Sequence, residues 1–337
     1  MTTPPEQDPA IPEPSTPSGD DSLTPDEILS SVIDYFPNTV QGLIQTQDGE
    51  PIAERPLFQS WYQLEIPPPT RIPNFGHLSI LCLLVIVGWL GAVALTFSAL
   101  HFHLFGVSNI QQAATDIHYT LASMVVLYLL AFGLCLLVFP LVWHKGYFAG
   151  LQWNAATAFR LWRWLFAAAG LCFALAIIDE LVLPSPSNAP IDKLFQTRLA
   201  AWLLFAFGVT IAPFFEEMFF RGFLLPALCT ACDWTAERFT HNRPRPLLEN
   251  GHPQWSVPAM LIASILTSIP FAWMHAEQTA HALGPFLLLV SVSLVLCAAR
   301  LASRSLAASV LVHASYNFLL FTLMLLGTGG FQHLDKM

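Results

Sequence analysis

The chain has 337 residues, of which 54% are hydrophobic and only 11% are charged, whereas ordinary soluble domains have about 25% charged residues. Its formal net charge of −9 says little about partners, because the acidic residues concentrate in the N-terminal tail. No basic patch or nucleic-acid-binding motif is present, which argues against a nucleic-acid role. The composition and the long apolar runs predict an all-α, polytopic protein that is integral to a lipid bilayer.

Residues 1–76 form a predicted N-terminal tail. Residues 1–26 are rich in Pro, Ser, Thr and Asp and are expected to be disordered, since they contain almost nothing that could form a core. The chain does not start with a basic segment followed by an apolar one, so we expect no cleaved signal peptide. A weak helical pattern over 25–44 predicts an amphipathic segment, and the three prolines 67–69 lead stiffly into the first span.

Residues 77–330 are predicted to form one transmembrane helical domain. Seven apolar runs are each close to the ~20 residues that cross a bilayer core. An eighth span would arise if the fourth run broke near Pro213 into two pieces. The runs cover about 78–100, 117–143, 161–184, 198–220, 257–275, 284–300 and 305–327.

Basic residues are unevenly divided between the two sets of connections. One set holds Arg55 and Arg71, then Lys145, Arg160 and Arg163, then Arg238, Arg243 and Arg245, then Arg300 and Arg304. The opposite set holds only Lys193, Arg198 and Lys336. The positive-inside rule therefore predicts a cytoplasmic N-terminus, in a bacterial-type plasma membrane.

The apolar run from 199 to 228 carries three ionisable side chains within six positions, Glu216, Glu217 and Arg221. Each costs about 2.5–3.5 kcal/mol at mid-bilayer, so such residues usually mark a functional site. Glu217 and Arg221 share a helix face and can pair, which lowers the desolvation cost of both. A purely structural ion pair is the alternative for these two. Glu216 is rotated by about 100° and is free to face the bundle interior.

Two further four-residue spacings occur at membrane depth, Phe271 to His275 and His313 to Asn317. Glu216, His275, His313 and Asn317 around one wet cavity would suit peptide hydrolysis. The carboxylate would act as general base, a histidine would hold the water, and a His and an Asn would stabilise the oxyanion. Glutamate with two histidines would equally suit a zinc ion. The sequence leaves both versions open.

Together the motifs Glu216-Glu217-x-x-x-Arg221, Phe271-x-x-x-His275 and His313-x-x-x-Asn317, in this order, resemble the CAAX-protease and bacteriocin-processing family. This family includes the Rce1-type prenyl-protein peptidases and the Abi proteins, and the resemblance covers about 198–320. It implies an all-α transmembrane bundle that hydrolyses a peptide bond in a peptide or prenylated-protein substrate.

By the family pattern, Glu216 would be the general base with His275 as its partner. His313 and Asn317 would form the oxyanion site, and Glu217 and Arg221 would support it. If zinc is bound, the resemblance implies Glu216, His275 and His313 as its ligands. We expect the site to open towards the cytoplasmic leaflet.

Two alternatives remain open. The chain could keep the fold but act as a binding or immunity protein, or it could be a small transporter or proton pathway. No inverted repeat is visible in the two halves, which weighs against a carrier.

The predicted spans conflict at one point. At ~1.5 Å per residue, Glu216 and His313 reach similar depths, but a straight helix would carry His275 too deep. A break at Pro270, or a span that begins late and runs tilted, would relieve this conflict.

Overall fold

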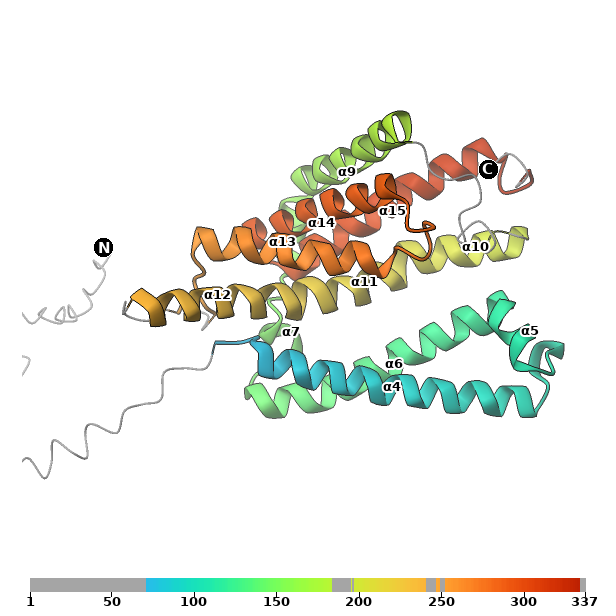
Figure 1. The fold of residues 1–337 in the computed structure, drawn as a ribbon, viewed down its shortest axis with the longest axis horizontal. Coiled ribbons are helices and arrows are strands. Elements are labelled where there is room, and N and C mark those ends of the chain that lie inside the picture. Colours follow the sequence, from blue (N-terminus) through green and yellow to red (C-terminus); the bar gives the residue numbers. More distant parts are fainter. Residues whose placement is uncertain (1–70, 184–194, 196, 241–246, 249–251, 334–337) are drawn as a thin grey trace, which may run out of the picture. The chain divides into compact units, whose positions relative to one another are not determined.

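A computed structural model of the chain describes residues 71–183, 195, 197–240, 247–248 and 252–333 (Figure 1). The chain divides into two units, Met1–Pro68 and Pro69–Met337, and only the second contains described residues. The predictions for residues 1–26, for the segment 25–44 and for the three prolines therefore fall outside the described part. Where the structure describes the chain, the regular elements are all helices, apart from an isolated bridge between Leu247 and Pro253.

Seven helices in the described part of the chain are long and apolar enough to cross a membrane, which confirms the predicted all-α polytopic fold. They are α4 (Phe75–His101), α6 (Ile117–Trp143), α9 (Trp162–Val182), the continuous helix Arg198–Thr240, α13 (Val257–Met274), α14 (Leu283–Ser303) and α15 (Leu306–Gly327). The described connections also contain short helices: η1 (Leu104–Gly106), α5 (Ile110–Thr115), α7 (Tyr147–Gly150) and α8 (Ala155–Arg160).

Helices α4 and α6 form a hairpin that lies beside the long helix (Figure 1). Gly88 allows the two backbones to approach closely, because a Cβ there would lie 3.0 Å from the backbone nitrogen of Ala131. Small residues serve this purpose at many membrane helix interfaces. At the start of α4, Arg71 donates two hydrogen bonds to the carboxylate of Glu237, of 2.8 and 3.0 Å. This ion pair fastens the hairpin to one end of the long helix.

The long helix consists of α10 (Arg198–Ala206), a π-helical segment η3 (Phe207–Ile211), α11 (Ala212–Glu217), a second π-helical segment η4 (Met218–Leu224) and α12 (Leu225–Thr240). It does not break at Pro213, so no eighth span arises there. Its 43 residues make it about 65 Å long at 1.5 Å per residue, roughly twice the ~30 Å hydrocarbon core. The predicted end at residue 220 was therefore about 20 residues too early.

Helices α13, α14 and α15 pack against the long helix, and α9 packs against α14 and α15. Their main core includes Cys172, Phe220, Phe271, Leu296 and Val312. Phe220 and Phe271 belong to two different motifs of the sequence, so this core already brings those motifs together. The core thereby sets the positions of the polar groups described below.

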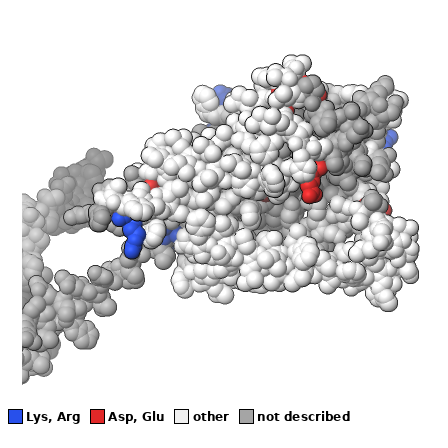
Figure 2. All heavy atoms as spheres, viewed as in Figure 1, with Lys and Arg blue, Asp and Glu red and all other residues white. Residues whose placement is uncertain are grey.

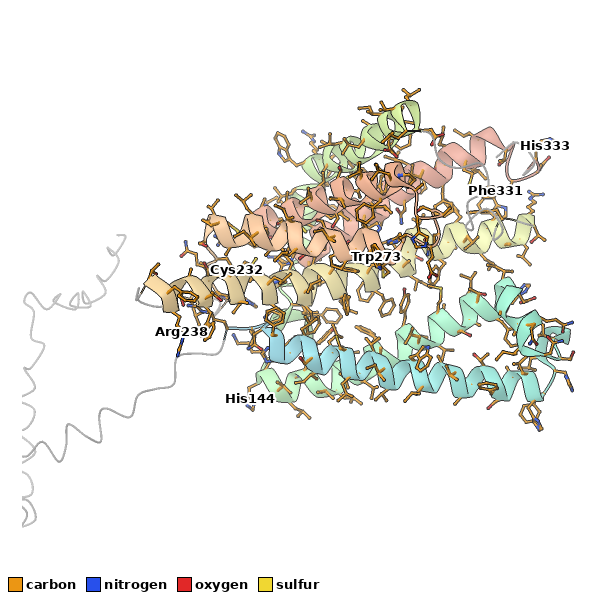
Figure 3. The ribbon with its side chains drawn as sticks, in the orientation of Figure 1. His144, Cys232, Arg238, Trp273, Phe331 and His333 are labelled. Carbon is orange, nitrogen blue, oxygen red and sulfur yellow. The ribbon has the colours of Figure 1, made fainter. Side chains whose placement is uncertain are left out.

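The outer surface of these helices matches a bilayer environment. Large apolar side chains such as Leu83, Leu141 and Leu266 are exposed, and the face in Figure 2 shows few charged atoms. His144 and Arg238 lie at one end of the bundle, and His333 lies at the other (Figure 3). Polar groups therefore mark the helix ends, and apolar groups cover the sides.

Candidate active site

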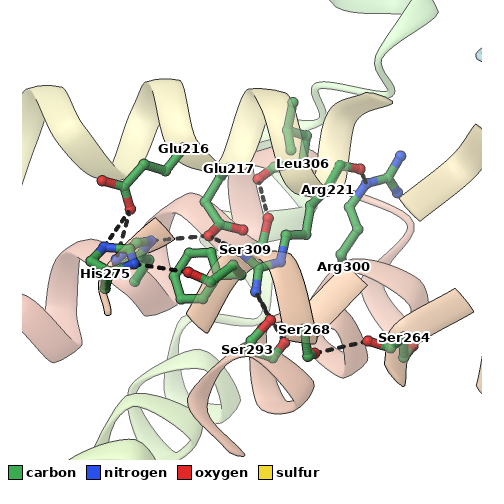
Figure 4. Close-up of polar contacts among 12 residues, drawn as sticks. Glu216, Glu217, Arg221, Ser264, Ser268, His275, Ser293, Arg300, Leu306 and Ser309 are labelled. Atoms are coloured by element: carbon green, nitrogen blue, oxygen red, sulfur yellow. Dashed lines mark hydrogen bonds and ion pairs between the residues drawn. The ribbon is translucent and has the colours of Figure 1, made fainter. Parts of the chain in front are cut away.

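The paired carboxylates Glu216 and Glu217 are the last two residues of α11, directly before the π-helical segment η4. The side chain of Glu217 is fully buried. Its Oε1 accepts hydrogen bonds from Arg221 Nη1 at 2.7 Å and from His313 Nδ1 at 3.0 Å (Figure 4). The ion pair expected from the four-residue spacing is therefore present, and it also contacts the third motif.

Arg221 joins three helices through one fully buried guanidinium group. Its Nη2 donates to the carbonyl oxygen of Ser293 at 3.1 Å and to the hydroxyl of Ser293 at 2.7 Å. The guanidinium also lies 4.5 Å from the centroid of the Phe271 ring, a cation–π contact that gains strength without water. These contacts and the bond to Glu217 hold the charge in place.

The contact with Glu217 decides how His313 presents its ring. Because a carboxylate paired with an arginine only accepts hydrogen bonds, Nδ1 of His313 carries the proton in this contact. A neutral ring then presents Nε2 as an acceptor. This Nε2 lies 3.8 Å from Oε2 of Glu216.

His275 is oriented in the same way by a different group. It is the C-cap of α13, and its Nδ1 lies 2.9 Å from the carbonyl oxygen of Phe271. A carbonyl only accepts, so Nδ1 is again the donor and Nε2 faces outward. Nε2 of His275 lies 3.9 Å from Oε2 of Glu216. Two imidazole acceptors therefore converge on one carboxylate oxygen.

The expected conflict in depth does not occur, and the extra length of the long helix is the reason. The backbone N–H of Ser256 donates to Oδ2 of Asp233 at 2.9 Å, so α13 starts level with a residue seventeen positions after Glu216. His275 lies nineteen positions after Ser256 on the neighbouring helix, which brings it back to the level of Glu216. Pro270 lies inside α13 without ending it.

Asn317 has a structural partner as well as a place at the site. Its Nδ2 donates to the carbonyl oxygen of Gly208 at 2.7 Å. In η3 the N–H of Ala212 bonds to the carbonyl of Phe207, five residues back. The next donor in that pattern would be Pro213, which has no N–H. Asn317 therefore supplies the donor that Pro213 lacks, and its second amide hydrogen remains for another acceptor.

Glu216 borders two cavities. The first, of about 370 Å³, is lined by Glu216, His275, His313 and Asn317 together with apolar residues. The four residues predicted to share a cavity are thus brought together, while Glu217 and Arg221 lie behind them. The second cavity, of about 240 Å³, separates the α4–α6 hairpin from the long helix and is almost wholly apolar. Tyr128, Tyr147 and Glu216 are the lining residues whose side chains carry oxygen atoms.

The first cavity lies in a different half of the bundle from the one expected. Its lining includes Ile117 at the start of α6, Gln278 after α13 and Pro285 at the start of α14. These helix ends are opposite the arginine-rich connections, towards which the site was expected to open. The apolar cavity extends the other way, to Tyr147 and Phe223.

Three residues contribute to the site without having been singled out for it. Phe271 orients His275 through its carbonyl and stacks its ring against Arg221; its motif position was noted, but this role was not. Ser293 binds Arg221 and carries no signal in an apolar run. Tyr128 lines the apolar cavity with Glu216 and stacks on Phe215, with ring centroids 4.6 Å apart. Its only signal is a hydroxyl at membrane depth.

The donor chemistry of Glu216, His275 and His313 is that of a zinc site, including an acceptor behind each histidine. In the part of the chain that the structure describes, however, no group of three or more His, Cys, Asp or Glu side chains is arranged so that it could hold a metal ion.

The helices and this site define a multi-pass membrane protein with a buried glutamate–histidine centre. Residues 198–319 match the family described as type II CAAX prenyl endopeptidase Rce1-like. This segment is thus an Rce1-like domain, which confirms the resemblance carried by the three motifs and indicates a protease. Searches of curated proteins and of solved structures gave no match.

Proposed function

We propose that the protein is an intramembrane endopeptidase that cleaves a CAAX-type prenylated or other membrane-associated peptide with a water molecule. The observation that carries this proposal is the convergence of two histidine Nε2 atoms on Oε2 of Glu216, at 3.8 and 3.9 Å. These distances are too long for direct hydrogen bonds. They leave room for one water that contacts the carboxylate and the imidazoles.

In the proposed reaction, Glu216 is the general base. It takes a proton from the water as the water oxygen attacks the carbonyl carbon of the scissile bond, and the carbonyl oxygen becomes an oxyanion. When the tetrahedral intermediate collapses, the carbon–nitrogen bond breaks and Glu216 returns the proton to the leaving nitrogen. One of the two histidines, His275 or His313, also holds the water by accepting its second hydrogen at Nε2.

Stabilisation of the oxyanion then falls chiefly to Asn317. Its second amide hydrogen is available, whereas Nε2 of His313 would need an extra proton before it could donate. Glu217 and Arg221 act as positioning residues, since Glu217 fixes the ring of His313. One oxyanion donor is typically worth about 2.7–4 kcal/mol of barrier.

The two cavities suit the two parts of a lipidated peptide. The histidine-lined cavity would hold the peptide bond, and the apolar cavity on the other side of Glu216 would hold a hydrocarbon chain. Burial of each CH₂ contributes about 0.8 kcal/mol, so a prenyl group would supply much of the binding free energy.

We also propose that the N-terminus is cytoplasmic in a bacterial-type plasma membrane. Arg71, Lys145 and Arg238 belong to helix ends on the arginine-rich side, which the positive-inside rule places in the cytoplasm.

The test compares the purified full-length wild type in lipid nanodiscs with Glu216→Gln. Both receive a farnesylated CAAX peptide and the same peptide without the lipid, and mass spectrometry follows the cleavage products. Wild type should release the C-terminal fragment, and Glu216→Gln should lose at least about a hundredfold in rate, the lower range for general-base catalysis. The lipid-free peptide should be cleaved more slowly because it leaves the apolar cavity empty.

Glu277→Gln is the matched control, because Glu277 is exposed and follows α13 close to His275 in sequence. Equal rates for wild type and Glu216→Gln would remove Glu216 from the mechanism. If the wild type binds the peptide without cleaving it, the result contradicts the enzyme and supports a binding protein. A further assay with a chelator tests for zinc. If the chelator abolishes activity and added zinc restores it, the attacking water is bound to a metal and not held by protein groups alone.

A further inference from the structure

Arg300, near the end of α14, is a buried cation that has no carboxylate partner among the described residues. It was expected among the charges of a connection, but only 2% of its surface is exposed. Among the described residues it forms no ion pair with a carboxylate, and its Nη1 has no hydrogen-bond partner. Arg300 therefore differs from Arg221, which has Glu217.

The partners that Arg300 does have are neutral. Its Nε donates to the carbonyl oxygen of Arg221 at 3.3 Å. Its Nη2 donates to the carbonyl of Leu151 at 3.3 Å and to Oε1 of Gln152 at 2.8 Å. Removing an ion from water costs several kcal/mol even after relaxation, and buried charges are normally compensated by opposite ones. The described part of the chain provides no such compensation.

Arg300 lines a cavity of about 580 Å³ that is separate from both cavities at Glu216. Arg304 lines the same cavity and is exposed. The cavity also contacts Ser256, the N-cap of α13, and Val257, its first residue. An 18-residue helix adds partial positive charge at its N-terminus. No Asp or Glu belongs to the described lining, so the charged groups that the described residues contribute to this cavity are positive.

The same cavity has an apolar side, formed by Val257, Met260 and Leu301 among others. Trp255 lies at its edge and donates its indole N–H to Thr230 Oγ1 at 3.2 Å. The cavity sits where α13 begins and α14 ends, which is the level at which transmembrane helices meet the headgroup region. Positive donors next to apolar walls at this level match a phosphate attached to acyl chains, whereas a free anion would need no apolar wall.

We propose that this cavity binds the phosphate group of an anionic phospholipid. Arg300 Nη1 and the guanidinium of Arg304 donate to phosphate oxygens, and the acyl chains pass along the apolar side. Basic pockets between transmembrane helices recognise lipid headgroups by the same chemistry, and arginine is suited to phosphate because its N–H groups match the spacing of two oxygens. The bound phosphate compensates the charge of Arg300.

The test measures lipid binding and does not depend on any catalytic activity. The full-length protein in detergent micelles is titrated with phosphatidylglycerol, phosphatidylcholine or inorganic phosphate, and native mass spectrometry reports bound lipid while thermal unfolding reports stabilisation. The variants are Arg300→Gln and Arg304→Gln. Arg238→Gln is the matched control, since Arg238 is an exposed arginine at the same end of the bundle that does not line the cavity (Figure 3).

Wild type and Arg238→Gln should bind phosphatidylglycerol in preference to phosphatidylcholine. Arg304→Gln should weaken binding about fivefold, which corresponds to the ~1 kcal/mol of one arginine near an anionic lipid surface. Arg300→Gln should weaken it at least as much. Because Arg304 is exposed, its variant remains informative if Arg300→Gln fails to fold. Equal binding of both lipids, or unchanged phosphatidylglycerol binding in Arg304→Gln, would overturn the proposal. Saturation by inorganic phosphate without lipid would overturn the lipid as ligand.

Discussion

Glu217 and Arg221 should behave as one coupled unit in a double-mutant cycle. Both side chains are fully buried and 2.7 Å apart. Arg221→Met leaves the carboxylate of Glu217 buried without its charged partner, and breaking a buried pair in this way costs about 3–5 kcal/mol. Glu217→Gln removes the charge but keeps an oxygen that accepts from Nδ1 of His313.

The double variant Glu217→Gln/Arg221→Met removes both charges at once. It should therefore be more stable than Arg221→Met alone, because no isolated charge remains in the core. At roughly 2–4 °C per kcal/mol for a domain of this size, Arg221→Met should lower the unfolding midpoint by roughly 6–20 °C, and the second substitution should restore part of it.

Thermal unfolding of the purified variants in one detergent measures these shifts. Ser293→Ala serves as a control, since it removes one hydrogen bond of Arg221 without separating the charges. If the double variant is as unstable as the sum of the two single variants, the residues are not coupled and the buried pair does not account for their burial.

Two further predictions concern other parts of the structure. Asn317→Leu leaves the carbonyl of Gly208 without a donor and should cost about 1–3 kcal/mol; adding Pro213→Ala supplies an N–H and should restore stability without restoring peptide cleavage. No recovery of the unfolding midpoint in the double variant would contradict this account of the π-helical segment. His252 lies outside the spans with Nε2 3.0 Å from the carbonyl of Ala149, and burial lowers its pKa below the ordinary 6.5. The unfolded chain therefore takes up a proton more readily, so stability should be full above about pH 6.5 and fall as the pH drops below it. His252→Gln should flatten this dependence between about pH 7.5 and 5, and an unchanged slope would show that another group titrates.

Much of this arrangement follows from the sequence because it depends on local spacing. Runs of about 20 apolar residues can satisfy their backbone hydrogen bonds in lipid only as helices, so the number of spans was predictable. The four-residue separation of Glu217 and Arg221 places them on one helix face whatever surrounds the helix. The pairs within the other two motifs are predictable for the same reason, since Phe271 and His275, and likewise His313 and Asn317, are four residues apart.

Other features depend on contacts between segments that are far apart in the chain. The predicted end of the long helix fell at residue 220 because the charged residues of α12 are typical of a connection. In the structure Glu237 is paired with Arg71, and Asp233 accepts a hydrogen bond from the N–H of Ser256. The contact between Asp233 and Ser256 helps to set the level of α13, which brings His275 to Glu216.

What the sequence by itself determined, then, was which residues could take part: two carboxylates, an arginine, two histidines and an asparagine in apolar helices. Only the tertiary structure decided how they act together. His313 donates to Glu217 and His275 donates to the carbonyl of Phe271, and these two hydrogen bonds orient both rings towards Glu216. Asn317 supplies a hydrogen-bond donor to the backbone carbonyl of Gly208. Such bonds require groups about 3 Å apart, a separation that no spacing along the chain can reveal.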